Sequence, residues 1–310
     1  MNPETRTHDD PCKVALRDDR NGVILQAGRY LELTKPRLSF LSVLTVLVGY
    51  FAARPAVDNW VLVSLMIGTS AAAGGAAVLN QWLERSTDTG MRRTRDRPIP
   101  AGHVPPAAAL VLGLLLCTFG GVLLTFGVNP LAGFLVLLTI GLYILAYTPL
   151  KKHTHWCTEV GAISGAIPPV IGWSAAEGAI GPGGWILFGI LFFWQMPHFH
   201  AIAWLYRHDY AAVRFPMLAA IDQTGFRVAR HMMLYGLLLF VVSLFPAILG
   251  EAGLPYLIAA LVFGGYFLWK ILCFRHAADR DSAARKIFFV SIIYLPLLLG
   301  SLVFAVSIPG

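Results

Sequence analysis

The chain has 310 residues, of which 56% are hydrophobic and only 13% are charged, with a formal net charge of +7. A soluble domain carries about 25% charged residues, so this composition excludes an ordinary soluble protein and indicates a membrane protein. The positive charge does not indicate nucleic-acid binding, because no basic stripe interleaved with aromatic residues lies on a soluble segment.

The first 28 residues form a polar segment that mixes acidic and basic side chains. This segment has neither the apolar core of a signal peptide nor the acid-poor composition of a mitochondrial transit peptide. We therefore expect a disordered cytoplasmic tail at residues 1–28 of a bacterial protein, followed by a transmembrane domain at residues 29–310.

Nine apolar stretches follow along the chain, each close to the roughly 20 residues that a helix needs to cross a bilayer. They are continuous and lack the alternation of lipid-facing strands, so we expect helices and not a barrel. The predicted fold is an all-α polytopic membrane bundle of about nine transmembrane helices, at residues 38–54, 60–80, 106–127, 131–148, 157–175, 184–204, 232–250, 254–272 and 287–308.

The basic residues are distributed unevenly between the two faces of this bundle. With nine spans, 23 of the 24 lysines and arginines fall on one face, and only Arg54 falls on the other. Loops rich in lysine and arginine stay on the cytoplasmic side of a membrane. We therefore expect a multi-pass protein of the bacterial inner membrane with a cytoplasmic N-terminus and an external C-terminus.

The second predicted span ends in three polar side chains spaced four residues apart, Asn80, Glu84 and Asp88. A helix advances about 100° per residue, so these side chains form one stripe, called the acid stripe below. Carboxylates bind Mg²⁺, often together with substrate phosphates. Because ionisable groups at membrane depth are costly, the acid stripe indicates a functional site for Mg²⁺ and a diphosphate.

An arginine-rich run follows the acid stripe directly, with Arg92, Arg93, Arg95 and Arg97. Guanidinium groups can bind phosphate or carboxylate through two parallel hydrogen bonds. Arginines beside a membrane span are also ordinary features of a cytoplasmic loop, so the run by itself does not indicate a site. Its position after the acid stripe favours a role in substrate binding.

The acid stripe resembles the first signature of the UbiA superfamily of intramembrane prenyltransferases, with Glu84 in place of a middle aspartate. The run Met91–Pro98 resembles the MxRTxxRP segment of the protoheme IX farnesyltransferase, or heme O synthase, branch. Near the superfamily's second aspartate ladder, this sequence offers only Asp209. Further segments agree with the branch, in its order, over about residues 30–300: 127–130, 147–152, 165–173, 194–199, 209–210 and 216–218.

The resemblance implies transfer of a farnesyl group from farnesyl diphosphate to a vinyl carbon of heme B, with water addition, giving heme O. It implies Mg²⁺ as cofactor, held by Glu84 and Asp88 with Asp209 as a further ligand, and heme A synthase as a partner protein. The implied catalytic residues are Asn80, Glu84, Asp88, Arg93, Lys151 and Asp209. The implied substrate-binding residues are Arg92, Arg97, Tyr147, Lys152, His198 and Tyr210.

The fifth and sixth predicted spans carry residues that bear on the substrate cavity. Pro168 and Pro169 should break the fifth helix, which a membrane protein tolerates beside a cavity. His198 could bind the heme iron, hydrogen-bond another helix or face a polar cavity. His200 points to a roughly opposite face, and we expect it to take part in packing or hydrogen bonding.

Three alternative functions fit parts of the same pattern. A prenyltransferase acting on an aromatic acid or quinone precursor would share the acid stripe, although the MRRT, WQMPHF and DY elements favour heme. A secondary transporter also has broken helices and polar residues at mid-depth, but its repeated halves are not evident in this sequence. A non-catalytic heme-handling protein would keep His198 and the arginines without requiring the acid stripe.

Overall fold

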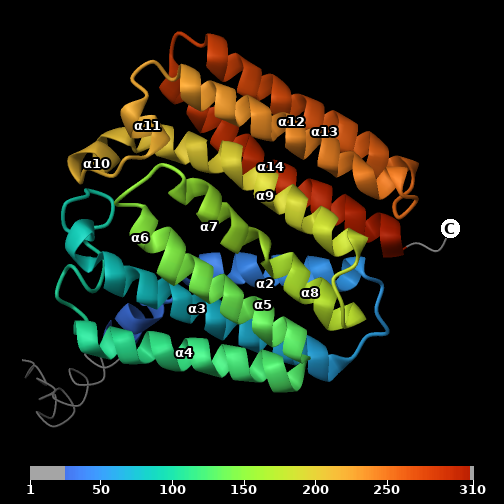
Figure 1. The fold of residues 1–310 in the computed structure, drawn as a ribbon, viewed down its shortest axis with the longest axis horizontal. Helices are drawn as coiled ribbons and strands as arrows, with labels where there is room; N and C mark the ends of the chain where they lie inside the picture. The colour runs from blue at the N-terminus through green and yellow to red at the C-terminus, as the bar shows by residue number, and fades with distance from the viewer. Residues whose placement is uncertain (1–24, 308–310) are drawn as a thin grey trace, which may run out of the picture.

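The computed structural model describes residues 25–307, and within this range every regular element is a helix (Figure 1). The all-α prediction is therefore confirmed. Residues 25–33 are already helical, so the predicted boundary between residues 28 and 29 falls inside a helix. The remainder of the predicted tail, residues 1–24, lies outside the described residues.

The helices run along the chain in the following order. They are α2 (Pro36–Ala52), α3 (Asn59–Asp88), α4 (Pro106–Gly127), α5 (Pro130–Gly141), the π-helix η1 (Leu142–Tyr147), α6 (Thr148–Leu150), α7 (Cys157–Ala166), α8 (Pro168–Glu177), α9 (Pro182–Leu205), α10 (Arg207–Ala212), α11 (Leu218–Ile221), α12 (Phe226–Ile248), α13 (Leu254–His276) and α14 (Arg280–Ser307). Many large apolar side chains are exposed on the outside of these helices, as is expected of a protein surrounded by lipid and not by water. The bundle therefore belongs in a membrane.

Seven segments of the described chain are long and apolar enough to cross a bilayer. They are α3, α4, the continuous run from α5 to α6, α9, α12, α13 and α14. The two other predicted spans correspond to α2, an apolar helix of 17 residues, and to the pair α7 and α8. The membrane-bundle prediction is confirmed, but the count of nine spans is not. Within residues 25–307, seven segments are full-length spans, and the other two predicted spans are a shorter helix and a broken pair.

Two irregularities interrupt the helices. The break between α7 and α8 falls at Ile167, directly before Pro168 and Pro169, as expected for residues that lack a backbone N–H. The second irregularity, η1, was not predicted from the sequence. Its Tyr143 and Tyr147 rings stack with centroids 5.3 Å apart. Because π-helical turns often occur at functional sites, η1 draws attention to these two tyrosines.

The contact between α3 and α4 depends on glycines spaced seven residues apart on both helices. A Cβ added at Gly68 or Gly75 of α3 would overlap atoms of α4, and one added at Gly113 or Gly120 of α4 would overlap atoms of α3. Lipid tails are as apolar as leucine, so close packing of small residues is a main source of helix association in membranes. This contact holds the helix that carries the acid stripe.

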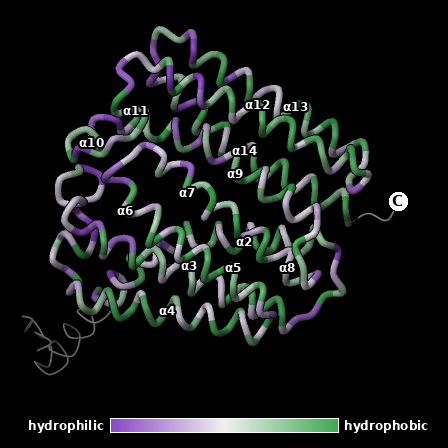
Figure 2. The backbone as a smooth tube through the Cα atoms, viewed as in Figure 1, coloured by the Kyte–Doolittle hydropathy of each residue, from purple (hydrophilic) through white to green (hydrophobic). Residues whose placement is uncertain are grey.

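Two large clusters of buried apolar side chains form the core of the bundle. The larger cluster joins α9, α12, α13 and α14, and the smaller joins α2, α3, α5 and α8. In Figure 1 the helices α12 and α13 lie above α9, and α3, α4 and α5 lie below it. Hydrophilic residues gather at the end of the bundle that carries α10 and α11, where α3 also ends (Figure 2).

Arg54, the single basic residue predicted for the opposite face, follows α2 in a left-handed conformation with φ of 52°. Its Nη2 donates a hydrogen bond to the carbonyl oxygen of Glu251 at 3.0 Å. Glu251 lies between α12 and α13. The α2–α3 and α12–α13 connections therefore meet at the end of the bundle away from α10 and α11.

We expect Gly172→Ala to destabilise the bundle, because α2 and α8 touch through their backbones at this point. A Cβ at Gly172 would overlap the Val46 carbonyl oxygen, and one at Gly49 would overlap the Pro169 carbonyl oxygen. Overpacking of this kind costs about 1–3 kcal/mol, so the midpoint of thermal unfolding in detergent should fall. Gly300→Ala on α14 is the control, because its added Cβ would meet nothing within 4 Å. Equal midpoints for the two variants would contradict the close contact.

Candidate functional site

The acid stripe lies on the last turns of α3, which continues past the predicted apolar span at residues 60–80 and ends at Asp88. Asn80, Glu84 and Asp88 are 2%, 4% and 0% exposed, so the stripe faces the protein interior. The helix extends past its apolar segment because its two carboxylates are buried against cationic side chains instead of turning to solvent. The prediction of a single polar face on this helix is correct.

Each carboxylate of the stripe is paired with a cation from another segment. Glu84 Oε1 accepts a hydrogen bond from Lys151 Nζ at 2.7 Å, and Asp88 Oδ2 accepts one from Arg97 Nη1 at 2.7 Å. Burial opposes the charge on Lys151, but the ion pair with the Glu84 carboxylate outweighs it and raises the pKa of this lysine well above its usual value. Removing one member of a buried ion pair costs about 3–5 kcal/mol, so these pairs hold the loops onto α3.

Asn80 does not contact the two carboxylates. Its Nδ2 donates to Thr148 Oγ1 at 3.0 Å, and Thr148 Oγ1 donates to the Tyr143 carbonyl oxygen at 2.8 Å. No hydrogen bond from Asn80 to Glu84 or Asp88 is present among the described residues. Successive members of the stripe are about 6 Å apart along the helix axis, and the carboxylates are already occupied by cations. Asn80 instead ties α3 to the end of η1.

The donor set at Asp88 fits a Mg²⁺ ion. Asp88 Oδ2 is bonded to Arg97, but the buried Oδ1 has no hydrogen-bond partner within residues 25–307. Buried carboxylate oxygens are almost always satisfied, and a hard cation with oxygen ligands would satisfy this one. Glu84, one helical turn before it, can supply a second oxygen.

A second carboxylate ladder is not assembled in the part of the chain that the structure describes. Asp209 lies on α10 and makes neither an ion pair nor a side-chain hydrogen bond there. Asp222 is buried, but it accepts hydrogen bonds from the backbone N–H groups of Thr224, Gly225 and Val228 and caps the start of α12. The predicted metal role of Asp209 is therefore without support from a neighbouring ligand.

A row of aromatic and basic side chains borders the stripe. The guanidinium of Arg93 lies 4.6 Å from the centroid of the Tyr206 ring, and its Nη2 lies 3.5 Å from the Tyr210 hydroxyl. Lys151 Nζ lies 4.4 Å from the centroid of the Tyr147 ring, so these two side chains lie on one face. Tyr147 also packs against the apolar cluster that contains Tyr210. Arg93 with Tyr210 and Lys151 with Tyr147 are thus two contacting pairs, and the second pair joins the acid stripe through Glu84.

Lys35 joins the site although sequence reasoning missed it. It lies directly before α2 with φ of 46°, in the left-handed region, and within electrostatic reach of both ion pairs. Burial, followed by the positive charges of Arg97 and Lys151, lowers the pKa of Lys35 to about 7. Its position beside Pro36, at the start of the first predicted span, is the only signal in the sequence that could have drawn attention to it.

Three predicted substrate-binding residues lie apart from this group. Arg92 and Lys152 are exposed and make no side-chain hydrogen bond or ion pair within the described chain. His198 lies on the side of α9 that faces α14, where its ring stacks against Trp194 and Phe288 at 5.0 and 5.2 Å. The acid stripe and His198 therefore mark two separate places in the bundle.

The hydrogen bonds around His198 assign its tautomer. Ser291 Oγ donates its single hydrogen to the Phe288 carbonyl oxygen at 2.6 Å. Ser291 Oγ must then accept the hydrogen bond from His198 Nδ1, 2.7 Å away. The proton of a neutral His198 is thus placed on Nδ1, which leaves the Nε2 lone pair available to a ligand.

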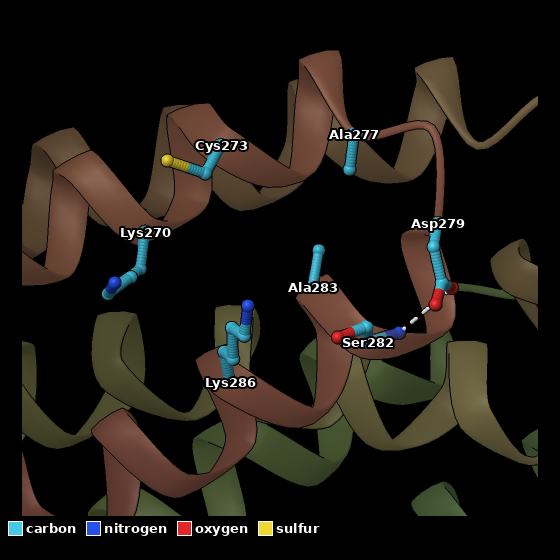
Figure 3. Close-up of a pocket in the computed structure, with 7 residues that line it drawn as sticks. All are labelled: Lys270, Cys273, Ala277, Asp279, Ser282, Ala283 and Lys286. Atoms are coloured by element: carbon cyan, nitrogen blue, oxygen red, sulfur yellow. Dashed lines mark hydrogen bonds between the residues drawn. The ribbon is translucent and has the colours of Figure 1, made fainter.

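A surface pocket of about 290 Å³ lies between α13 and α14 (Figure 3). Lys270 and Lys286 point into it, and Asp279 caps the first turn of α14 by accepting from Ser282 N at 3.1 Å. None of the predicted site residues lines it. It is a hollow between two helix ends and lies apart from the carboxylates.

Comparison with known proteins identifies similar sequences over most of this chain. Residues 42–293 match the model of the UbiA prenyltransferase family. A protein named protoheme IX farnesyltransferase from Opitutus terrae is 57% identical over 274 residues, which cover 88% of this chain and 93% of the relative. Another of that name, from Solibacter usitatus, is 43% identical and covers 87% of this chain and 96% of the relative.

Solved structures share the fold at lower sequence identity. A digeranylgeranylglyceryl phosphate synthase superposes with a TM-score of 0.78 at 16% identity, covering 91% of this chain and 99% of that protein. A UbiA homologue from Archaeoglobus fulgidus bound to DMAPP and Mg²⁺ superposes with a TM-score of 0.62 at 12% identity, covering 91% of this chain and 100% of that protein. The bundle is therefore the fold of these membrane proteins.

The low pKa of Lys35 predicts that the chain binds a Mg²⁺–diphosphate complex more weakly as pH rises. Between pH 6 and pH 8 the ammonium passes from mostly charged to mostly neutral, because its pKa is about 7. Loss of one charge contact of about 1 kcal/mol should raise the Kd for inorganic diphosphate about fivefold, measured by calorimetry with excess Mg²⁺.

Lys35→Arg is the matched control, because arginine stays charged throughout this pH range. Diphosphate and Mg²⁺ titrate identically in both experiments, so only the difference between the two pH profiles reports on residue 35. Parallel profiles for the original chain and Lys35→Arg would contradict the role of Lys35.

Proposed function

The chain belongs to the UbiA prenyltransferase family, and from this premise we propose that it transfers a farnesyl group from farnesyl diphosphate to heme B. In this reaction the bond between farnesyl C1 and the diphosphate oxygen breaks, and the electron pair leaves with diphosphate. A vinyl carbon of heme B forms the new C–C bond. Water adds to the neighbouring vinyl carbon and releases a proton, so the products are heme O and diphosphate.

The observation that carries this proposal is the 57% identity, over 88% of the chain, to a relative named protoheme IX farnesyltransferase. The site geometry supports it, because buried carboxylates and three cations meet at one end of the bundle. A non-catalytic heme-handling protein would not need this arrangement. A secondary transporter is disfavoured by the family match.

The acid stripe would hold the metal ion that assists ionisation of the allylic diphosphate. Bound there, Mg²⁺ would supply positive charge to the departing diphosphate, as metal ions do for phosphoryl leaving groups. Glu84 and Asp88 Oδ1 would hold it, and Mg²⁺ bound to a UbiA homologue from Archaeoglobus fulgidus is consistent with that role. Lys151 and Arg97 would then turn from the carboxylates toward the phosphate oxygens and stabilise the charge that develops on them.

The row of aromatic side chains beside the stripe would protect the allylic cation. Aromatic faces attract cations, and the Tyr147 ring already lies 4.4 Å from Lys151 Nζ. Tyr147 and Tyr210 would exclude water until the vinyl group attacks. Arg93, held by Tyr206 and Tyr210, lies where it would meet a phosphate or a heme propionate.

His198 is the proposed heme ligand on the other side of α9. Its Nε2 lone pair is free because Ser291 holds the proton on Nδ1. A metal-binding imidazole usually donates its other N–H to such a partner, which fixes the ring. Arg92 and Lys152, both exposed, would contact the propionates or the anionic membrane surface.

We place the protein in the bacterial inner membrane, with the end that carries the acid stripe facing the cytoplasm. The concentration of lysine and arginine on that face supports this orientation. Water-soluble prenyl diphosphate would then reach the carboxylates from the cytoplasm, while its farnesyl tail enters the apolar bundle. Heme O would be a substrate for a heme A synthase, the proposed partner protein.

We expect Asp88→Asn to lower heme O formation at least about 100-fold, because it removes a metal oxygen and the partner of Arg97. The assay supplies heme B, farnesyl diphosphate and Mg²⁺ to membranes that contain the chain, and detects heme O by chromatography and mass. Removal of Mg²⁺ with a chelator should produce the same loss in the unmodified chain.

Asp96→Asn is the matched control, since Asp96 lies eight residues away with its side chain 85% exposed. It should retain the activity of the unmodified chain. Heme O formation that survives Asp88→Asn, in protein that elutes as a single species, would overturn the catalytic assignment. If the chain instead prenylated an aromatic acid and left heme B unchanged, the alternative acceptor would be correct.

A further inference from the structure

A second cluster of polar side chains lies inside the bundle, apart from the acid stripe. It consists of Glu159 on α7, His200 on α9 and His231 on α12, and one ligand atom of each lies within 4.8 Å of the others. His200 is 2% exposed. Three helices from different parts of the chain therefore present two imidazoles and a carboxylate to one point.

Each of the three side chains contains a buried polar atom that lacks a hydrogen-bond partner in the described chain. Glu159 Oε2, His200 Nε2 and His231 Nδ1 are buried and have no hydrogen-bond partner within residues 25–307. Buried polar atoms are normally hydrogen-bonded, and an unsatisfied one is costly. Of eight such atoms in the described chain, three meet here, so a shared ligand explains them better than three separate defects.

The donor set identifies the class of ligand. Two imidazole nitrogens and one carboxylate oxygen bind late first-row divalent metals, and three protein ligands leave a coordination position open. Metal bonds of about 2.0–2.1 Å in a tetrahedral site place ligand atoms about 3.3 Å apart, so small side-chain rotations from the present separations would complete the site.

We propose that Glu159, His200 and His231 bind a divalent transition-metal ion such as Zn²⁺. A heme iron does not fit this cluster, because its porphyrin occupies four positions and leaves only two opposite axial ones. Mg²⁺ does not fit it either, since hard cations prefer oxygen ligands. The inference is independent of the proposed farnesyl transfer.

The position of the cluster indicates how the ion would enter the bundle and which helices it would join. Glu159 is two residues from the start of α7, His231 is five residues from the start of α12, and His200 is five residues from the end of α9. All three lie near the polar end of the bundle, where an ion can enter from water. A bound ion would join α7 to α9 and α12, which belong to different parts of the fold.

Co²⁺ is a suitable probe, because a bound ion absorbs visible light. The full chain is purified in detergent, treated with a chelator, and titrated with Co²⁺ in excess Mg²⁺, which saturates the carboxylates of the acid stripe. We expect one Co²⁺ per chain, displaced by Zn²⁺. His200→Gln and Glu159→Gln should each weaken binding at least tenfold, whereas His198→Gln, on the same helix but bonded to Ser291, should retain it.

Thermal unfolding provides a second measurement that does not require any variant to fold. Zn²⁺ should raise the unfolding midpoint of the unmodified chain, and a chelator should lower it again, because a ligand that binds only the folded state stabilises it. Asp88→Asn should still bind Co²⁺, which separates this site from the proposed reaction. Absence of Co²⁺ binding by the unmodified chain, or equal binding by His200→Gln, would overturn the proposal.

Discussion

Two carboxylates buried at the end of one transmembrane helix have to be neutralised, and the arrangement of the surrounding segments depends on this requirement. Glu84 pairs with Lys151 and Asp88 pairs with Arg97, each at 2.7 Å. These pairs bring the segment after α6 and the loop after α3 onto the same helix end. A buried charge without its partner costs several kcal/mol, so α3 can carry charge to residue 88 only because these cations meet it.

The same charged groups that pair with one another at the end of α3 are suited to receive an anionic substrate. Lys35, Arg97 and Lys151 place three cations around two carboxylates. Burial, followed by this excess of positive charge, lowers the pKa of Lys35 to about 7. A metal–diphosphate complex would relieve that excess of positive charge. Its phosphate oxygens would pair with the cations, and its metal ion would pair with the carboxylates. During binding, each buried charge would exchange one oppositely charged partner for another. No charge would therefore be left unpaired in the apolar interior.

Helix α9 places two histidines, only two positions apart in the sequence, in different environments. His198 faces α14, where Ser291 fixes its proton, whereas His200 faces α7 and α12, where Glu159 and His231 converge on it. Two residues correspond to about 200° around a helix, so the opposite directions follow from helix geometry. The sequence predicted the opposite faces correctly, but it assigned His200 to packing or hydrogen bonding, because nothing local indicates that Glu159 and His231 lie beside it.

The sequence by itself determined the features that repeat over short distances. Long apolar runs fixed the all-α membrane bundle, the four-residue spacing placed Glu84 and Asp88 on one face, and Pro168 with Pro169 located the break between α7 and α8. Tertiary structure alone decided which cation meets which carboxylate, since Glu84 and Lys151 are 67 residues apart. It also decided the bond from Asn80 to Thr148 and the approach of Lys35, because such contacts depend on how helices pack across the bundle and leave no periodic pattern in the chain.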